Sequence, residues 1–207
     1  MNPDKQRKLI AVALLASDPS VRRDALSGTI GDTQAFCWGA LRQFDRRREQ
    51  INASSPLQHG LSHSDLHLLL IVAHEAVSHV ERIEELLASI GVSQSLSPDE
   101  ALRTRLREAR NLLAEHRDER ILYWRLTGNH TPRVVAAYER LGIMLPKDSI
   151  DSEVIGYSPP PGSSDAEAET GYATIGTVGG LLSLPDLEAA LRQLSIELEE
   201  LVGLHAV

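Results

Sequence analysis

The sequence predicts a mainly α-helical fold, in which a bundle of four to five helices is followed by a β-hairpin and a closing helix. Apolar residues recur every three or four positions over most of the 207 residues, which is the spacing of an amphipathic helix. Only 4% of the residues are aromatic, so leucine, isoleucine, valine and alanine must build the interior. Capping residues and prolines precede several of these apolar periods, and glycines follow them.

The N-terminal quarter of the chain predicts three helices. Residues 4–16 have helical periodicity, and Asp18 and Pro19 end this segment while supplying the cap and the first-turn proline of the next helix. Asp32 is placed to cap a separate, longer helix that ends near residues 52–56. The apolar stripe of that longer helix consists of Ala35, Phe36, Gly39, Ala40, Gln43 and Phe44.

The strongest helical pattern covers residues 62–90 and ends at Gly91. One face of this helix is apolar throughout, which predicts that it is the central helix of the bundle. The residues of this face are Leu66, Leu69, Leu70, Ala73, Val77, Val80, Ile83 and Leu87.

Two further helices complete the bundle, which we expect to occupy residues 1–145. Residues 97–100 combine a serine, a proline and two acidic residues, which is typical of a helix start. This helix is expected to continue to about Arg125 and to stop at residues 127–129, which include a glycine. A short helix then covers residues 132–141.

The composition changes in residues 146–207. Residues 154–157 and 172–178 are rich in β-branched and aromatic residues, and they predict the two strands of a hairpin. Residues 158–170 are rich in proline, serine and acidic residues, and they predict a flexible loop at the tip of that hairpin. A closing helix begins at Leu184, and the whole segment is expected to pack on the bundle as one compact unit. The buried side of this helix is predicted to consist of Leu187, Leu191, Leu194, Leu198 and Leu201.

Charge and composition exclude several classes of protein. The net charge of −8 opposes unspecific adhesion to nucleic acid or to an anionic membrane surface. No apolar run reaches the roughly 18 residues that a membrane span requires, and the charged residues 1–5 are unlike the start of a signal peptide. The single cysteine, Cys37, excludes an intramolecular disulfide. These features predict a soluble, cytoplasmic protein with no membrane partner.

The eight histidines do not form any of the common metal motifs. His74 and His79 are five residues apart, whereas a zinc protease helix places its two histidines four apart. None of the histidines follows a glutamate by three residues, as a di-iron bundle requires. His63, His67 and His74 lie near one stripe of a helix, so metal or ligand binding there stays as a minor alternative. We expect no metal and no cofactor.

Other catalytic motifs are also absent. The glycines at positions 176, 179 and 180 match neither a phosphate-binding loop nor a dinucleotide fingerprint. No nucleophile elbow occurs, and Cys37 lies on an apolar helical stripe, which favours a place in the core over a role as nucleophile.

Residues 103–120 are dense in charge and still keep leucines in helical register. On a continuous helix His116 falls in the middle of the apolar face, and Arg120 and Trp124 continue that face at spacings of four. A buried guanidinium needs a carboxylate, a carbonyl or an aromatic face as a partner. We therefore expect a structural polar network that consists of Glu115, Asp118, Arg120 and Trp124, next to His116.

Arg110 and Asn111, separated by four residues from His116, resemble the signature of the higher-eukaryote-and-prokaryote nucleotide-binding (HEPN) superfamily. Proteins of that superfamily are all-helical bundles, many are dimers, and many cleave RNA without a metal. The resemblance implies that Arg110 contacts phosphate, that His116 is the general acid or base, and that Asn111 supports them.

The fuller string from Arg110 to Arg120, which contains Glu-His-Arg-Asp-Glu-Arg, is also similar to one in bacterial helical proteins of no assigned activity. That resemblance covers about the C-terminal half of the chain, including a similar hairpin and a leucine-rich last helix. It implies a bacterial helical protein and assigns no chemistry.

These features lead to two main functional hypotheses. The first is a non-catalytic module that binds a protein partner or a second copy of the chain as a homodimer. The alternative is a HEPN-like, metal-independent ribonuclease or nucleotide-binding protein, with RNA as partner and with Arg110 and His116 in the site. These two residues diverge by about 120° on a continuous helix, so the alternative requires a helix break or a partner copy. Burial of His116 favours the first hypothesis, and its exposure in a groove beside a symmetry-related Arg110 favours the second.

Overall fold

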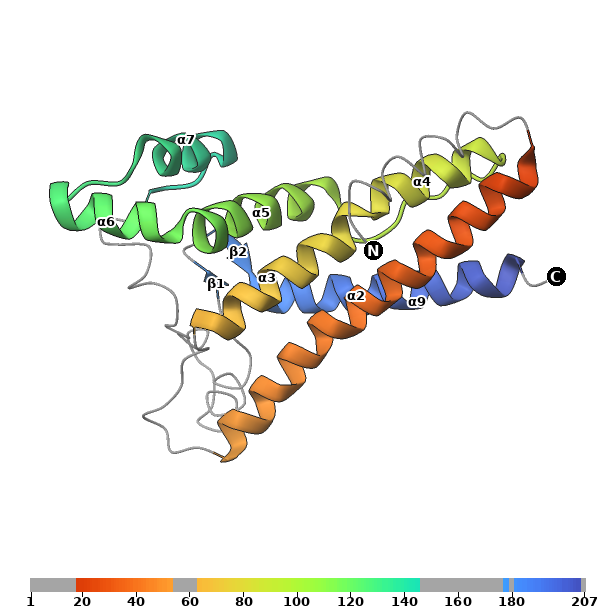
Figure 1. Ribbon diagram of the computed structural model, residues 1–207, viewed down its shortest axis with the longest axis horizontal. Coiled ribbons are helices and arrows are strands. Elements are labelled where there is room, and N and C mark those ends of the chain that lie inside the picture. Colours follow the sequence, from red (N-terminus) through yellow and green to blue (C-terminus); the bar gives the residue numbers. More distant parts are fainter. Residues whose placement is uncertain (1–17, 54–62, 146–176, 179–180, 206–207) are drawn as a thin grey trace, which may run out of the picture.

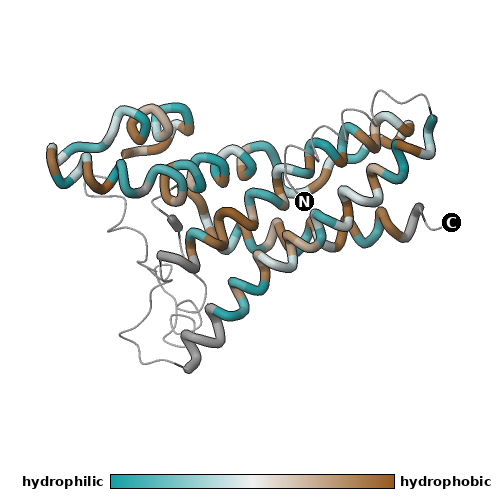
Figure 2. The backbone as a smooth tube through the Cα atoms, viewed as in Figure 1, coloured by the Kyte–Doolittle hydropathy of each residue, from teal (hydrophilic) through white to brown (hydrophobic). Residues whose placement is uncertain are grey.

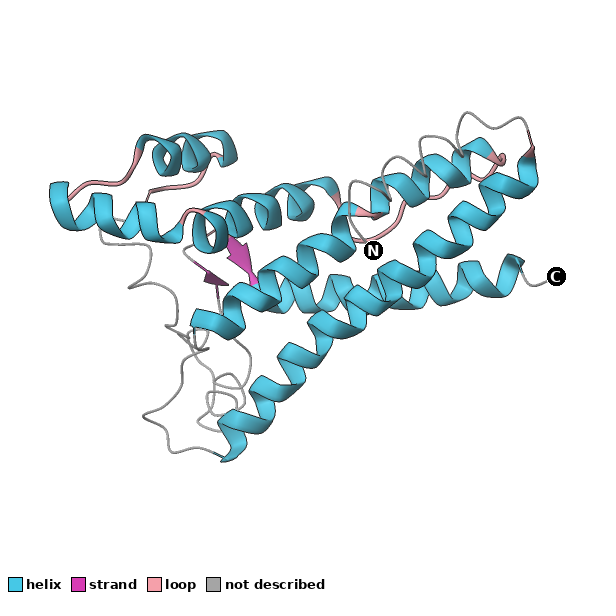
Figure 3. Cartoon of the chain, in the orientation of Figure 1, coloured by secondary structure: helices cyan, strands magenta, loops and turns pink. Residues whose placement is uncertain are grey.

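The computed structural model of the protein describes residues 18–53, 63–145, 177–178 and 181–205, and most of them are helical (Figures 1 and 3). This confirms the predicted mainly α-helical class. The α-helices are α2 (Pro19–Ala53), α3 (His63–Ser78), α4 (Val80–Ser89), α5 (Glu100–Arg110), α6 (Arg117–Thr127), α7 (Pro132–Leu141) and α9 (Leu184–His205). A π-helix, η2 (Asn111–Glu115), separates α5 from α6, and two short strands, β1 (Thr177–Val178) and β2 (Leu182–Ser183), precede α9.

The start of α2 is as predicted, because the carboxylate of Asp18 accepts a hydrogen bond from the backbone N–H of Ser20 at 2.8 Å. This bond holds the pKa of Asp18 below its ordinary value. The expected break at Asp32 is wrong, because α2 runs without interruption for 35 residues. Buried residues continue past Asp32 on one face, so packing holds the helix together there. They include Leu26, Ile30, Thr33, Cys37, Ala40 and Phe44.

The helix predicted for residues 62–90 forms with one irregularity, at His79, which separates α3 from α4. All eight residues of its predicted apolar face are buried, and Gly91 ends it with a φ of 85°. The ring of His79 is 1% exposed and its Nδ1 lies 3.3 Å from the hydroxyl of Thr33 on α2. Its ring also meets the edge of Phe36, with centroids 5.6 Å apart. This polar contact therefore joins α2 to the residue that separates α3 from α4.

The helix predicted from residues 97–100 to about Arg125 has the expected ends and an unexpected interior. Asp99 caps it by accepting from the N–H of Leu102 at 2.8 Å, and Gly128 ends it with a φ of 67°. Between these ends lies η2, which the periodicity did not predict. The short helix α7 has the predicted bounds and is capped by Thr131.

The core forms where α2 packs against α3, α4 and α9, and where α3 packs against α5. Figure 2 shows hydrophobic and hydrophilic residues alternating along these helices, as amphipathic helices require. The predicted buried side of α9 is confirmed, since each of its five leucines is at most 1% exposed. None of the described helices is both long enough and apolar enough to span a membrane.

The observed strand pair differs from the predicted hairpin. β1 pairs antiparallel with β2, and Val178 lies opposite Leu182. The first predicted strand, residues 154–157, and the predicted tip, residues 158–170, lie outside the described residues. The partner strand is β2, which lies between the second predicted strand and the closing helix. Leu181 and Leu182 are fully buried, and β2 packs against both α5 and α9.

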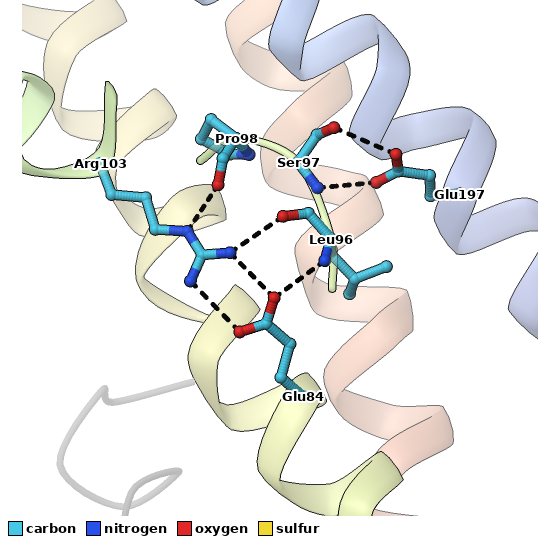
Figure 4. Close-up of polar contacts among 6 residues, drawn as sticks. All are labelled: Glu84, Leu96, Ser97, Pro98, Arg103 and Glu197. Atoms are coloured by element: carbon cyan, nitrogen blue, oxygen red, sulfur yellow. Dashed lines mark hydrogen bonds and ion pairs between the residues drawn. The ribbon is translucent and has the colours of Figure 1, made fainter. Parts of the chain in front are cut away.

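A polar network fixes the loop between α4 and α5 (Figure 4). Arg103, which is 7% exposed, donates to both carboxylate oxygens of Glu84 and to the carbonyls of Leu96 and Pro98. Glu84 also accepts from the N–H of Leu96 at 2.8 Å. On the other side of the loop, Glu197 of α9 accepts from the N–H and the hydroxyl of Ser97. Two carboxylates thus hold one loop against three helices.

Candidate functional site

The charged stretch that the sequence singles out lies at the junction between α5 and α6. The N–H of His116 donates to the carbonyl of Asn111 at 3.0 Å, a step of five residues in place of the four of an α-helix. His116 itself has a φ of −112° and a ψ of 22°, and α6 begins at the next residue. A π-turn takes one residue more than an α-turn, so the periodicity of a continuous α-helix does not hold across this junction.

Arg110 and Asn111 lie together at the start of this junction. Nη1 of Arg110 donates to Oδ1 of Asn111 at 3.3 Å, and Nη2 pairs with the carboxylate of Glu115. Nε of Arg110 is buried without a hydrogen-bond partner in the described part of the chain. The positive charge of Arg110 is therefore already balanced by a carboxylate, which weakens its attraction for a phosphate.

His116 is not inside the bundle, so the expectation that it points inward is wrong. Its side chain is 38% exposed, and its Nδ1 lies 3.6 Å from Oε2 of Glu119. Within the described residues, no hydrogen bond or ion pair joins His116 to Arg110, and each lies beside a different carboxylate. His116 ends η2 with a backbone that is not helical, so the periodicity of a continuous helix does not place its side chain correctly.

Arg120 does point inward, as expected. It is 4% exposed, and its Nε donates to the carbonyl of Leu112 at 3.1 Å. The ring of Trp124 packs on His130, with centroids 4.6 Å apart, and Asp118 is exposed. Glu115, the fourth member of the predicted network, pairs with Arg110. Arg120 is thus the member with the burial and the backbone contact of a structural residue.

Two of the three histidines that left a metal site open, His67 and His74, have described side chains. His67 is exposed, His74 is partly buried, and the side chain of His63 lies outside the described part. Across residues 18–53, 63–145 and the described C-terminal segment, no three His, Cys, Asp or Glu side chains are grouped to hold a metal ion. Cys37 is fully buried in the core, and burial raises the pKa of its thiol to about 12. A thiol that stays protonated at neutral pH is a poor nucleophile.

A groove between α2 and α9 is the feature that the sequence analysis missed. It encloses about 860 Å³ and is lined on the α2 side by Ala35, Trp38, Gly39 and Arg42. Ile196 and Ser195 line it from α9. Trp38 is 56% exposed and Ile196 is 51% exposed, so two large apolar side chains lie open to solvent in one groove.

Charged side chains lie at one end of this α2/α9 groove. Arg192 of α9 bridges Asp45 of α2 at 3.3 Å and Glu188 at 2.8 Å. Arg42 lines the groove beside this bridge, and it makes no hydrogen bond or ion pair within the described residues. The groove therefore combines an apolar surface with one cation, Arg42, that has no ion pair in the described part of the chain.

A sequence signal for this groove did exist. Trp38 follows Cys37 and lies beside the buried stripe of α2 that contains Cys37 and Ala40. On a helix, neighbouring residues point about 100° apart, so a buried Cys37 implies that Trp38 lies on a flank.

No family model, no curated protein and no solved structure matches the chain.

Proposed function

We propose that the protein is a non-catalytic helical module whose α2/α9 groove binds an amphipathic helix of a partner protein. The observation that carries this proposal is the exposure of Trp38 beside Ile196 in that groove. Tryptophan and arginine are the residues most enriched among those that dominate binding energy at protein interfaces. An exposed tryptophan in an apolar groove is therefore an anchor for a partner.

The length of the groove favours a helix as the bound element. Its α2 lining runs from Ala35 to Asp45, which is about 15 Å at 1.5 Å per residue. That length matches about three turns of a bound helix, which places apolar side chains every three or four residues against the groove. The charge of Arg42 at one end, which no described carboxylate pairs, complements an acidic side chain of that helix.

Helical peptides selected from a displayed library on the immobilised protein test this proposal. We expect the selected peptides to be amphipathic, with an acidic residue at one end. Trp38→Ala is expected to weaken their binding by about 30-fold, since a hot-spot residue contributes about 2 kcal/mol or more. Arg42→Gln is expected to weaken it by about three- to tenfold and to make it less sensitive to salt. The affinities are measured by fluorescence anisotropy.

Leu126→Ala provides the matched control, because Leu126 is 76% exposed on α6 and does not line the groove. It is expected to leave peptide affinity unchanged. Equal affinity of the parent and Trp38→Ala, or a loss of affinity in Leu126→Ala, would contradict the proposal. Sedimentation at rising protein concentration adds a second readout: a dimer that Trp38→Ala dissociates would identify a second copy as the occupant.

We retain a HEPN-like ribonuclease as the second candidate because a specific observation favours testing it. The helix between Arg110 and His116 is interrupted by η2, and the side chain of His116 is accessible to solvent. The pairing of Arg110 with Glu115 argues against it.

His116→Ala separates the two candidates. Because His116 is not buried, we expect this variant to change the free energy of unfolding by less than about 1 kcal/mol, as measured by urea denaturation. If the protein is a non-catalytic module, we expect no cleavage when the parent protein is incubated with RNA in EDTA. Cleavage by the parent that His116→Ala abolishes, and that Glu119→Gln retains, would replace the module by the ribonuclease.

A further inference from the structure

A second cavity lies between α3, α4 and α5, away from the α2/α9 groove. It encloses about 200 Å³. Most of the polar side chains that line it are cations or hydrogen-bond donors. The polar side chains of the lining are those of His74 and Ser78 of α3, Glu81 and Arg82 of α4, and Arg103 and Arg107 of α5.

Arg103 supplies this cavity with a rigid donor. A guanidinium has five N–H groups. Four of those of Arg103 are used, by Pro98, by Leu96 and by the two oxygens of Glu84. The fifth, on Nη1, has no partner in the described part of the chain. The side chain is 7% exposed and lines the cavity, so a donor held by four hydrogen bonds is preorganised there.

Arg107 supplies a free cation at the same cavity. It lies four residues after Arg103, so both project from the same face of α5. Arg107 is exposed and makes no hydrogen bond or ion pair within the described residues. Its guanidinium is therefore available to close over a ligand that the preorganised donor holds.

The charge of the cavity favours an anion. The charge of Arg103 is balanced by Glu84, whereas Arg107 makes no ion pair within the described residues. The cavity is lined by three arginines, Arg82, Arg103 and Arg107, and by the single carboxylate of Glu81, in a protein whose net charge is −8. Guanidinium groups bind phosphate in a bidentate geometry that a spherical anion such as chloride cannot use.

We propose that this cavity between α3, α4 and α5 binds the phosphate group of a small phosphorylated ligand. Its volume is below the roughly 300 Å³ at which pockets for drug-sized ligands begin, which fits a phosphate or a small phosphomonoester. Arg103 is the fixed donor and Arg107 the mobile one. This assignment is independent of the α2/α9 groove and of the junction at η2.

Titration of the full-length protein with inorganic phosphate by isothermal calorimetry tests the proposal, at constant ionic strength maintained with chloride. We expect one site with a Kd of about 0.1 to 1 mM, the range of a few charge-assisted contacts. Arg107→Gln is expected to raise this Kd by about tenfold. Phenyl phosphate is expected to compete with phosphate at the same site.

Arg105→Gln is the matched control, because it removes the same charge from α5 as Arg107→Gln does. Arg105 lines a different cavity. The Arg105→Gln substitution is expected to leave the Kd within about twofold of the parent value. The absence of binding at about 10 mM phosphate would overturn the proposal. Equal weakening by Arg105→Gln and Arg107→Gln would overturn it too, since that result indicates general attraction without a site.

Discussion

Glu84→Ala is expected to lower the free energy of unfolding by about 3 kcal/mol, as measured by urea denaturation followed by circular dichroism. The substitution leaves the buried guanidinium of Arg103 without its counter-ion, and the loss of one member of a buried pair typically costs about 3 to 5 kcal/mol. It also removes the acceptor of the Leu96 N–H. We expect the lower part of the range because a quarter of the Glu84 side chain is exposed.

The neighbouring Glu85→Ala controls for the loss of a carboxylate from α4. Glu85 is exposed, so its removal is expected to change stability by less than about 0.5 kcal/mol. The double variant Glu84→Leu with Arg103→Met is expected to lose less unfolding free energy than the two single variants lose together, because it leaves no unpaired buried charge. Simple additivity of the two would show that the pair is not coupled.

The lowered pKa of Glu84 predicts that the stability of the protein decreases in acid. Burial by itself raises the pKa of Glu84, but hydrogen bonds from Arg103 and the Leu96 N–H, with the charge of Arg103, lower it below 4.5 overall. A folded-state pKa below the unfolded value stabilises the protein above about pH 4.5, and this contribution is lost as pH falls through the folded value. Glu84→Gln is therefore expected to flatten the dependence of stability on pH below 4.5.

Arg120→Met is expected to cost about 2 to 3 kcal/mol. Methionine retains most of the volume but cannot donate to the carbonyl of Leu112, and hydrogen bonds from charged groups contribute about 1.5 to 3 kcal/mol. Because this carbonyl belongs to η2, we also expect faster hydrogen exchange of the amides from Leu112 to His116. Urea denaturation and exchange mass spectrometry measure the two effects.

Arg125→Met is the control for Arg120→Met. Arg125 is exposed on the same helix and makes no hydrogen bond or ion pair within the described residues. Its substitution is expected to change stability by less than about 0.5 kcal/mol and to leave exchange in η2 unchanged. Equal exchange in both variants would show that Arg120 does not hold the π-turn.

Helix ends were the most predictable part of the fold, because they depend on neighbouring residues. Asp18 and Asp99 cap the helices that they precede, and each bonds to an N–H two or three residues later. Gly91, Gly128 and Gly142 have positive φ values at the ends of helices, where other residues are strained. No new helix begins at Asp32, because the buried face of α2 continues past this residue and packing outweighs a single cap.

The candidate site was less predictable than the helices that carry it. Arg110 donates to the neighbouring Asn111, whereas His116 lies beside Glu119. A periodicity of 3.6 residues assumes a continuous α-helix, and one π-turn between the two residues invalidates it. No local preference in this leucine-rich segment distinguishes an α-turn from a π-turn.

The sequence alone determined the helical class, most helix ends and the buried faces of α3, α4 and α9, since caps and periodicity act over a few residues. Tertiary structure decided the rest. Ser97 meets Glu197 across 100 positions, and Asp45 meets Arg192 across 147. The groove beside Trp38 and the cavity beside Arg107 also form between helices. Such sites depend on how faces distant in the sequence pack together, which no local pattern specifies.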